Sequence, residues 1–428
     1  MQPQEIDTLL LCRWLIPVIP EDQVWENQVI AIDCGRIVAL GMEAEMQRLY
    51  APRQTVLLDR HLVMPGLVNS HCQTATRLLR GHGDNQLSES WLQRYYQPTD
   101  SRFISSEFIA NSASLAMAEM IKTGTTCFAD LYFAQESLVD AIRTAGLRSQ
   151  ISFVVTNTPT VHAQSADDAI HSGLTLQDNI GDHPLIKVAC APLGFNELAD
   201  AVAKRIAVYI DELDMAVHLP CHQSNTEISQ SISLHSCRPL ERLNAQGLLA
   251  PHTQLAHMHQ LSAEDIKLLE STNSHVLRCP DSAPADSYPI SQLLDRDINV
   301  ALSSEGGIHH QLNHLQTVKR AATTDTASSV DNKFHRALRM ATINGARALG
   351  WEGQIGSIET GKYADIIALE IDPIQQHPLY NSPVQLLGSA QGHQVSHSWV
   401  AGKPLMSEQK LLTLDEKNLS NLATHWRP

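Results

Sequence analysis

Short apolar runs recur along the middle of the chain, from about residue 59 to 350, and a polar residue follows many of them. Segments with helical periodicity separate the runs, for example Glu107 to Ile121, which ends before Gly124. Strands and helices in alternation indicate a parallel sheet. Eight runs over roughly 290 residues favour a closed (β/α)8 barrel over an open doubly wound sheet. The runs are Val63–Val68, Cys127–Asp130, Ile151–Val155, Ile186–Cys190, Met215–His218, Gln254–His257, His275–Arg278 and Asn299–Leu302.

The two chain ends have a different pattern, in which apolar and polar positions alternate over short segments. Such alternation is typical of strands with one buried face. We expect the ends to pair with each other, so that the small domain is discontinuous in sequence. The segments are Thr8–Cys12, Gln28–Asp33, Ile37–Leu40, Ala364–Leu369 and His397–Gly402.

The predicted fold class is therefore α/β: a (β/α)8 TIM-type barrel with a small discontinuous β-sandwich domain formed by both chain ends. We expect residues 1–58 and 355–428 to make the composite β-sandwich domain. Residues 59–354 then make the barrel. No Gly-x-Gly-x-x-Gly motif follows any predicted strand, which argues against dinucleotide binding.

Composition limits the partners of the protein. With 428 residues, of which 43% are hydrophobic, the chain can bury a large core. Its formal charge of −15 argues against nucleic-acid binding, which needs a basic surface. No run of about 18 apolar residues is present, and the N-terminus carries Glu5 and Asp7 instead of a basic region, so we expect no membrane span and a cytoplasmic location. Eight cysteines without Cys-x-x-Cys spacing are expected to be mostly small buried residues.

Four polar residues lie at or just after the ends of predicted strands: His71, His218, His257 and Glu305. In a barrel, reacting groups lie at the carboxyl ends of the strands. Three neutral imidazoles and a carboxylate can hold a divalent metal such as zinc, which lowers the pKa of a bound water towards ~7. A single histidine among 21 is more often an ordinary core or surface residue. The four placements together favour a metal site.

Longer motifs give the chain a family resemblance. They run through nearly all of it: Met64-Pro-Gly-Leu-Val-Asn-Ser-His71, Leu78-Leu-Arg-Gly81, Gly124-Thr-Thr126 with Ala129-Asp-Leu-Tyr132, Gln254-Leu-Ala-His257, Cys279-Pro280, Ala341–Gly350 and Ile355–Asp365. In these motifs the chain resembles the amidohydrolase superfamily, in particular its branch of hydrolytic deaminases and chlorohydrolases that act on aminopurine nucleosides and triazines.

The resemblance implies hydrolysis of a carbon–nitrogen bond, as in a hydrolytic deaminase of an aminopurine nucleoside or a similar heterocycle. It also implies one divalent metal, which is zinc or else iron or nickel. The metal site of the superfamily consists of His-x-His, a third and a fourth histidine, and an aspartate, with a glutamate three residues after the third histidine. His71, His218 and His257 match three of these positions. The other three differ here: Gln73 replaces the second histidine, Cys221 the glutamate and Glu305 the aspartate.

These substitutions leave several interpretations open. A neutral amide oxygen is a weaker zinc ligand than imidazole, so Gln73 is a weak or lost ligand. The extra methylene of Glu305 moves its carboxylate outward, and the exact placement decides whether it can both bind the metal and act as the catalytic base. Cys221 is either a catalytic residue, a thiolate ligand in a closed His3Cys structural site, or a small residue without a role.

The resemblance also implies a substrate pocket with Arg80, Trp91 and Tyr132, although the same residues can simply brace loops. Two hypotheses follow. The first is a metal-dependent hydrolase of a small heterocyclic molecule. The second is a catalytically degenerate family member without a firmly bound metal, which acts as a ligand-binding or subunit-interaction protein. Because many members of the superfamily self-associate, we expect a homodimer in either case.

Overall fold

The computed structural model describes residues 3–80, 105–133, 136–160, 162–196, 198–282, 289–305, 311–325, 329–372, 374 and 382–426. The chain divides into two compact units. The first consists of Met1–Asn69, Ala118–Cys127 and Asn313–Glu416, and the second of Ser70–Met117, Phe128–Leu312 and Lys417–Pro428. In the described part of the chain, no helix is both long and apolar enough to cross a membrane.

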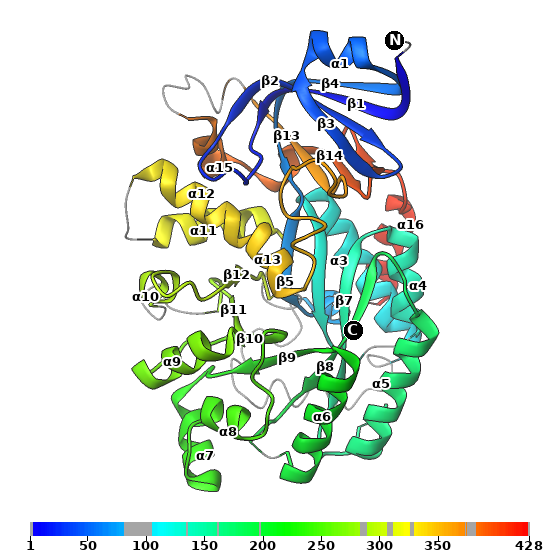
Figure 1. Cartoon of the computed structure of the whole chain (residues 1–428). Coiled ribbons are helices and arrows are strands. Elements are labelled where there is room, and N and C mark those ends of the chain that lie inside the picture. The colour runs from blue at the N-terminus through cyan, green and yellow to red at the C-terminus, as the bar shows by residue number, and fades with distance from the viewer. Residues whose placement is uncertain are drawn as a thin grey trace. The chain divides into compact units, whose positions relative to one another are not determined.

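The first unit contains a sheet made by both chain ends, as the alternating pattern predicts. Its eight strands have the order β16-β15-β14-β13-β4-β1-β2-β3, with the blue N-terminal strands beside the orange C-terminal ones in Figure 1. Strands β4 and β13 join the two ends by antiparallel pairing. The bounds are β1 Gln4–Leu15, β2 Trp25–Asp33, β3 Arg36–Met42, β4 Tyr50–Pro65, β13 Ile366–Glu370, β14 Val395–Val400, β15 Lys403–Ser407 and β16 Lys410–Leu411.

Alternation along β1 assigns its side chains to two cores. Leu10 and Cys12 belong to a buried cluster with Ile366 of β13 and Trp399 of β14. Leu9 belongs to a second cluster. Because successive side chains of a strand point to opposite faces, one period-two pattern supplies both cores.

The second sheet is the predicted parallel one. Its order is β12-β11-β10-β9-β8-β7-β6-β5, and each strand from β7 to β11 pairs in parallel with the next. A parallel bridge between Cys72 and Glu305 connects its two end strands, so the sheet closes on itself. The TIM-type fold class is therefore confirmed. The bounds are β5 Leu67–Cys72, β6 Thr125–Leu131, β7 Arg148–Val155, β8 Ile186–Pro192, β9 Ala216–Cys221, β10 Thr253–His257, β11 His275–Arg278 and β12 Val300–Leu302.

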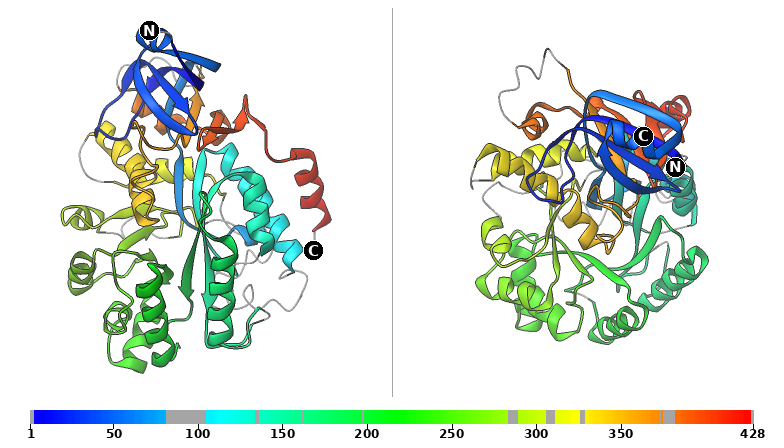
Figure 2. Two further views of the ribbon diagram at one scale, coloured as in Figure 1. Left: turned by 45° about the vertical axis from the view of Figure 1, so that its right-hand side comes forward. Right: turned by 45° about the horizontal axis from the view of Figure 1, so that its top comes forward.

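The helices after β6 to β10 lie outside this sheet, as the right-hand view of Figure 2 shows. Serine residues begin several of them: Ser165, Ser224 and Ser262 each accept a hydrogen bond from a backbone N–H of the first turn. Helices that lie wholly within the second unit include η1 Thr74–Leu79, α4 Glu136–Ala145, α5 Ala166–Ile180, α6 Asp200–Leu213, α7 Asn225–His235, α8 Pro239–Ala245, α9 Ala263–Thr272 and α10 Ile290–Leu294.

The remaining helices include α3, Ser106–Lys122, which confirms the helix predicted from Glu107 to Ile121. Gly124, with φ +92°, follows it at the predicted stop. The others are α1 Glu43–Leu49, α11 His314–Thr324, α12 Val330–Met340, α13 Ile343–Ala348, η4 Pro383–Gln385, α15 Leu386–Ser389, η5 Gly392–Gln394 and α16 Glu416–His425.

One predicted strand, Val63–Val68, is wrong as a single element. Its first residues end β4 in the first sheet, and its last residues begin β5 in the parallel sheet. The change occurs at Gly66, where a Cβ atom would lie 2.0 Å from Oγ1 of Thr126. The apolar run is continuous because both strands are buried, so hydrophobicity alone does not reveal the change of sheet.

Candidate metal centre

The four predicted residues gather near the rim of the parallel sheet, meaning the carboxyl ends of β5 to β12 and the residues directly after them. The prediction that His218 ends its strand is wrong, because β9 continues to Cys221. His71 lies in β5, His218 in β9 and His257 at the end of β10, and Glu305 follows β12. Nδ1 of His71 is 2.8 Å from Nε2 of His218, and the rings of His71 and His257 are 5.7 Å apart. Nε2 of His257 is 3.7 Å from Oε1 of Glu305. The structure thus brings all four together.

The backbone at the rim adopts an unusual conformation. His257 has φ +74° and Glu305 has φ +55°, which is left-handed for residues that carry a side chain. Such conformations cost about 1–3 kcal/mol each and gather at functional sites. The bonds from Glu305 N–H to the His71 carbonyl and from Gln73 N–H to the Glu305 carbonyl, both 3.2 Å, hold this turn in place.

His71 and His218 are fully buried and neutral at neutral pH. Burial and the neighbouring imidazoles of His218 and His257 hold the pKa of His71 well below its usual range, and burial lowers the pKa of His218 to about 3. Neutral imidazole is the form that binds a metal.

A hydrogen-bonded chain couples the tautomers of this pair. Nδ1 of His218 is 3.1 Å from Oγ of Ser152 in β7. If each Nδ1–H donates, His71 to His218 and His218 to Ser152, the lone pair of His71 Nε2 remains available. This buried Nε2 has no hydrogen-bond partner in the described structure. Since an unsatisfied buried polar atom costs about 1–3 kcal/mol, a cation at this nitrogen fits the site. In the same arrangement both nitrogens of His218 are engaged, so His218 binds a metal only if its contact with His71 opens.

Cys279, of the Cys279-Pro280 motif, is a rim residue for which the sequence alone predicts no metal-binding role. It directly follows β11, and one donor atom from each of Cys279, His257 and Glu305 lies within 4.8 Å of the other two. Burial and Glu305 raise the pKa of its thiol well above the usual range. The pattern that identified the histidines, a possible metal ligand at the end of an apolar run, would also have identified Cys279.

Gln73 and Cys221 occupy different surroundings. Gln73 is the N-cap of η1, and its carbonyl accepts bonds from the N–H and the hydroxyl of Thr76. Cys221 ends β9 and is buried. Burial, followed by the carboxylates of Glu227 and Asp265, raises the pKa of its thiol well above the usual range. A thiol that holds its proton this firmly is a poor general acid or base near neutral pH.

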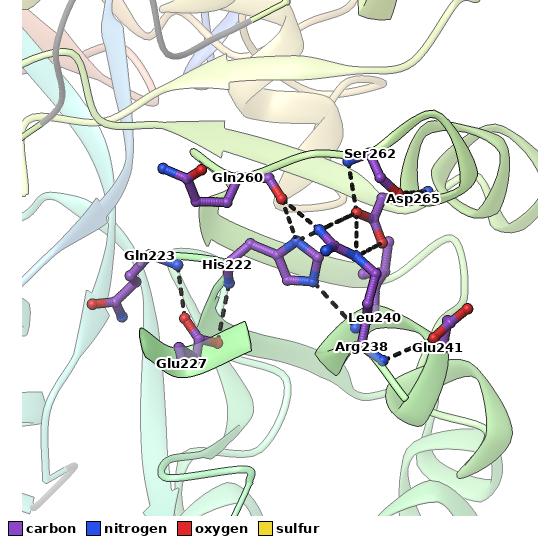
Figure 3. Close-up of polar contacts among 9 residues, drawn as sticks. All are labelled: His222, Gln223, Glu227, Arg238, Leu240, Glu241, Gln260, Ser262 and Asp265. Carbon is purple, nitrogen blue, oxygen red and sulfur yellow. Dashed lines mark hydrogen bonds and ion pairs between the residues drawn. The ribbon is translucent and has the colours of Figure 1, made fainter. Parts of the chain in front are cut away.

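A polar network around the buried side chains of His222 and Asp265 fixes the chain after Cys221 (Figure 3). Nδ1 of His222 lies 3.1 Å from the Gln260 carbonyl, and Nε2 accepts from the Leu240 N–H at 3.3 Å. These partners define a neutral His222, and burial accordingly lowers its pKa. Arg238 donates two bonds from Nε and Nη2 to Asp265, at 3.0 and 2.7 Å. The loops after β9 and β10 are therefore braced against each other, which fixes the rim between His218 and His257.

The residues expected to bind substrate are only partly described. Arg80 is the C-cap of η1 and half-buried. Tyr132 follows β6 and is buried, and burial followed by the charge of Asp130 raises its pKa above the usual range. Asp130 itself was missed as a separate candidate: burial raises the pKa of this carboxyl to about 6, although the N–H of Thr74 donates to it at 2.7 Å. Trp91 lies outside the described residues.

Comparisons with known proteins show which sequences and structures the chain is similar to. The model of the amidohydrolase family matches residues 62–405. A 5-methylthioadenosine/S-adenosylhomocysteine deaminase from Teredinibacter turnerae is 39% identical over 431 residues, which cover 99% of this chain and 97% of that protein. A protein of the same name from Saccharophagus degradans is 34% identical and covers 98% and 96%.

Two solved structures share the fold over almost their whole length. An adenosine deaminase from Xanthomonas campestris with bound zinc has a TM-score of 0.93 and 32% identity, covering 99% of this chain and 98% of that one. An atrazine chlorohydrolase from Arthrobacter aurescens, complexed with zinc, has a TM-score of 0.86 at 20% identity and covers 98% and 99%. The second shows likeness of fold alone.

Proposed function

From the premise that this chain belongs to the amidohydrolase family, we propose that it is a metal-dependent hydrolytic deaminase of a 6-aminopurine nucleoside or a similar heterocyclic amine. The observation that carries the proposal is the gathering of His71, His257 and Glu305 at one rim, where Nε2 of His71 has no hydrogen-bond partner among the described residues. The names of the relatives suggest 5-methylthioadenosine, S-adenosylhomocysteine and adenosine as substrates to test.

The proposed metal is a single divalent ion, zinc or else iron or nickel. His71, His257 and Glu305 would hold it, and His218 would join them if its contact with His71 opens. When bound, such an ion supplies a water whose pKa lies near ~7. Mixed nitrogen and oxygen donors suit these metals.

The protein's own residues have separate proposed tasks. Glu305 is the half-buried carboxylate beside His257, so it can accept the proton of the attacking water and return it to the leaving amine. The reaction consumes one water, replaces the exocyclic amine by a carbonyl oxygen and releases ammonia. Arg80, Trp91 and Tyr132 remain proposed contacts of the substrate.

The test is ammonia release by the purified protein loaded with one equivalent of zinc, with each of the three named nucleosides. We expect turnover that stops on chelation and returns with zinc. A protein that contains no metal when purified, binds none on addition and releases no ammonia would instead support the degenerate family member described above.

Three further expectations remain proposals. We propose a homodimer, which sedimentation equilibrium tests, and a cytoplasmic location, which fractionation of cells tests. We also propose the domain boundaries at 58 and 355, for which limited proteolysis is the test.

A further inference from the structure

The rim contains one strong donor that the proposed function does not use. Cys279 follows β11, which lies between β10 and β12 in the sheet. It therefore lies between the strand that carries His257 and the strand that precedes Glu305. A donor atom of each of the three residues lies within 4.8 Å of the others, and Cys279 is fully buried.

The neighbours of Cys279 differ from those of an ordinary core cysteine. Cys190 in β8 is also buried, but among the described residues it belongs to no group of possible metal ligands. A small apolar residue would satisfy the packing of a core position equally well. A sulfur beside an imidazole and a carboxylate instead forms a set of three donors typical of zinc and related metals.

A sulfur donor after β11 can make up for the weak donor after β5, and it comes from a cysteine in a motif that the chain shares with its family. Gln73 offers only a neutral amide oxygen, a weak ligand for zinc, whereas a cysteine sulfur is among the strongest. The site would then take donors from the end of β10 and from the residues after β11 and β12, beside His71 of β5.

We propose that Cys279 is a ligand of the metal at the rim, together with His257 and Glu305, and replaces the donor that Gln73 does not supply. The sulfur–metal bond forms from a lone pair of the thiolate, and the thiol proton leaves to solvent. The inference rests on the proposed function only in that a divalent metal binds at the rim.

Cobalt is the probe for this ligand, because thiolate bound to Co²⁺ gives an intense charge-transfer band in the near ultraviolet. The metal-free full-length protein is titrated with Co²⁺ and its spectrum recorded. We expect the band to saturate at one cobalt per chain. In Cys279→Ser we expect the band to vanish and cobalt affinity to fall on the order of 100-fold, comparable with or greater than the effect of removing a supporting partner of a metal ligand.

Two matched variants distinguish the cysteines. Cys190→Ser removes a buried thiol of β8, and Cys221→Ser removes the rim thiol of the alternative His3Cys site. Both should keep the band. A band that survives in Cys279→Ser, a band lost in Cys221→Ser, or cobalt bound without any band would each overturn the proposal, as would a wild-type protein that binds no cobalt.

Zinc X-ray absorption of the wild-type protein gives an answer if Cys279→Ser does not fold. A sulfur shell near ~2.3 Å is expected beside nitrogen and oxygen near ~2.0–2.1 Å, and it should persist in Cys221→Ser. A first shell of nitrogen and oxygen alone would refute the assignment. The outcome is independent of the proposed activity. A sulfur ligand without deamination would refute the proposed function alone. Deamination without a sulfur ligand would refute this inference alone.

Discussion

The imidazoles of His71 and His218 share one hydrogen across 2.8 Å, and Ser152 continues the chain at 3.1 Å. The tautomers are coupled: when His218 donates its Nδ1–H to the hydroxyl of Ser152 in β7, its Nε2 accepts from Nδ1–H of His71, and Nε2 of His71 then offers a lone pair. Partners that orient a metal-binding histidine contribute to affinity although they never touch the metal.

Ser152→Ala should therefore weaken metal binding without removing a ligand. The expected loss is about tenfold in zinc affinity, at the lower end of the effect of removing such partners. Competition with a chromophoric chelator measures it. Ser271→Ala, an exposed serine that bonds the Leu268 carbonyl, is the control and should bind zinc like the wild type. Equal affinities in the two variants would disprove the role of the chain.

Glu305→Gln tests the proposed proton transfer at the same scale. The amide keeps the size of the side chain, and the bonds that close the sheet use the backbone of residue 305. We expect kcat to fall by about 10²- to 10⁴-fold, the range typical of a lost general base. Steady-state kinetics at saturating zinc measure it, with the thermal midpoint as the check on folding. A kcat within a few-fold of the wild-type value would show that Glu305 is not the general base.

At the scale of elements, the junction of β4 and β5 determines where His71 lies. Gly66 separates the two sheets and has no room for a methyl group beside Thr126. A one-residue shift in β5 would turn His71 to the opposite face of the strand. The glycine therefore contributes to the site through the register of its strand.

Gly66→Ala should lower the free energy of unfolding by about 2 to 3 kcal/mol, because overpacking a closely packed core costs this much. Gly353→Ala is the matched control, since no atom lies within 4 Å of its added Cβ. Urea denaturation of both variants measures the difference. If the two variants unfold at the same urea concentration, the junction is not closely packed in solution.

The elements also show how far sequence reasoning reaches. Runs such as His275–Arg278 are strands as predicted, because a short buried strand is a short apolar run. The change from β4 to β5 at Gly66 was not predicted, because the residues on both sides of it are equally buried and make one continuous apolar run. His71 and His257 were found from their positions after apolar runs, whereas Cys279 was not, since a cysteine in such a place is most often a core residue.

At the scale of the whole molecule, buried histidines link folding to pH. Burial lowers the pKa of His314 to about 3, that of His218 to about 3 and that of His61, partly buried, to about 4, all from the ordinary value of 6.5. Each is neutral in the folded protein and protonates near pH 6.5 when unfolded. Their stabilisation is complete above pH 6.5 and is lost progressively as the pH falls towards the folded values. Asp130, whose pKa is raised, has the opposite effect: between pH 3.8 and about 6 its contribution to the free energy of unfolding grows as the pH falls.

The metal-free protein should therefore be less stable at pH 5 than at pH 7.5. Below pH 6.5 each fully buried histidine contributes up to about 1.4 kcal/mol per pH unit, so several outweigh the single Asp130. Urea denaturation in the presence of chelator at both pH values is the measurement. In His314→Gln the dependence on pH should be shallower. Stability that is flat or rises on acidification would contradict the neutral state of these side chains.

The bridge between Cys72 and Glu305 gives Glu305 two tasks: its backbone closes the parallel sheet, and its side chain is the proposed reactive carboxylate. A metal bound to that carboxylate also stabilises the backbone bonds that close the sheet. The amide hydrogens of Gln73 and Glu305, which make these bonds, therefore report whether the metal is bound. Deuterium uptake at these two amides should slow when zinc is added, while uptake at Leu9, paired within the other sheet, stays the same. Deuterium uptake would thus detect bound zinc without any measurement of activity.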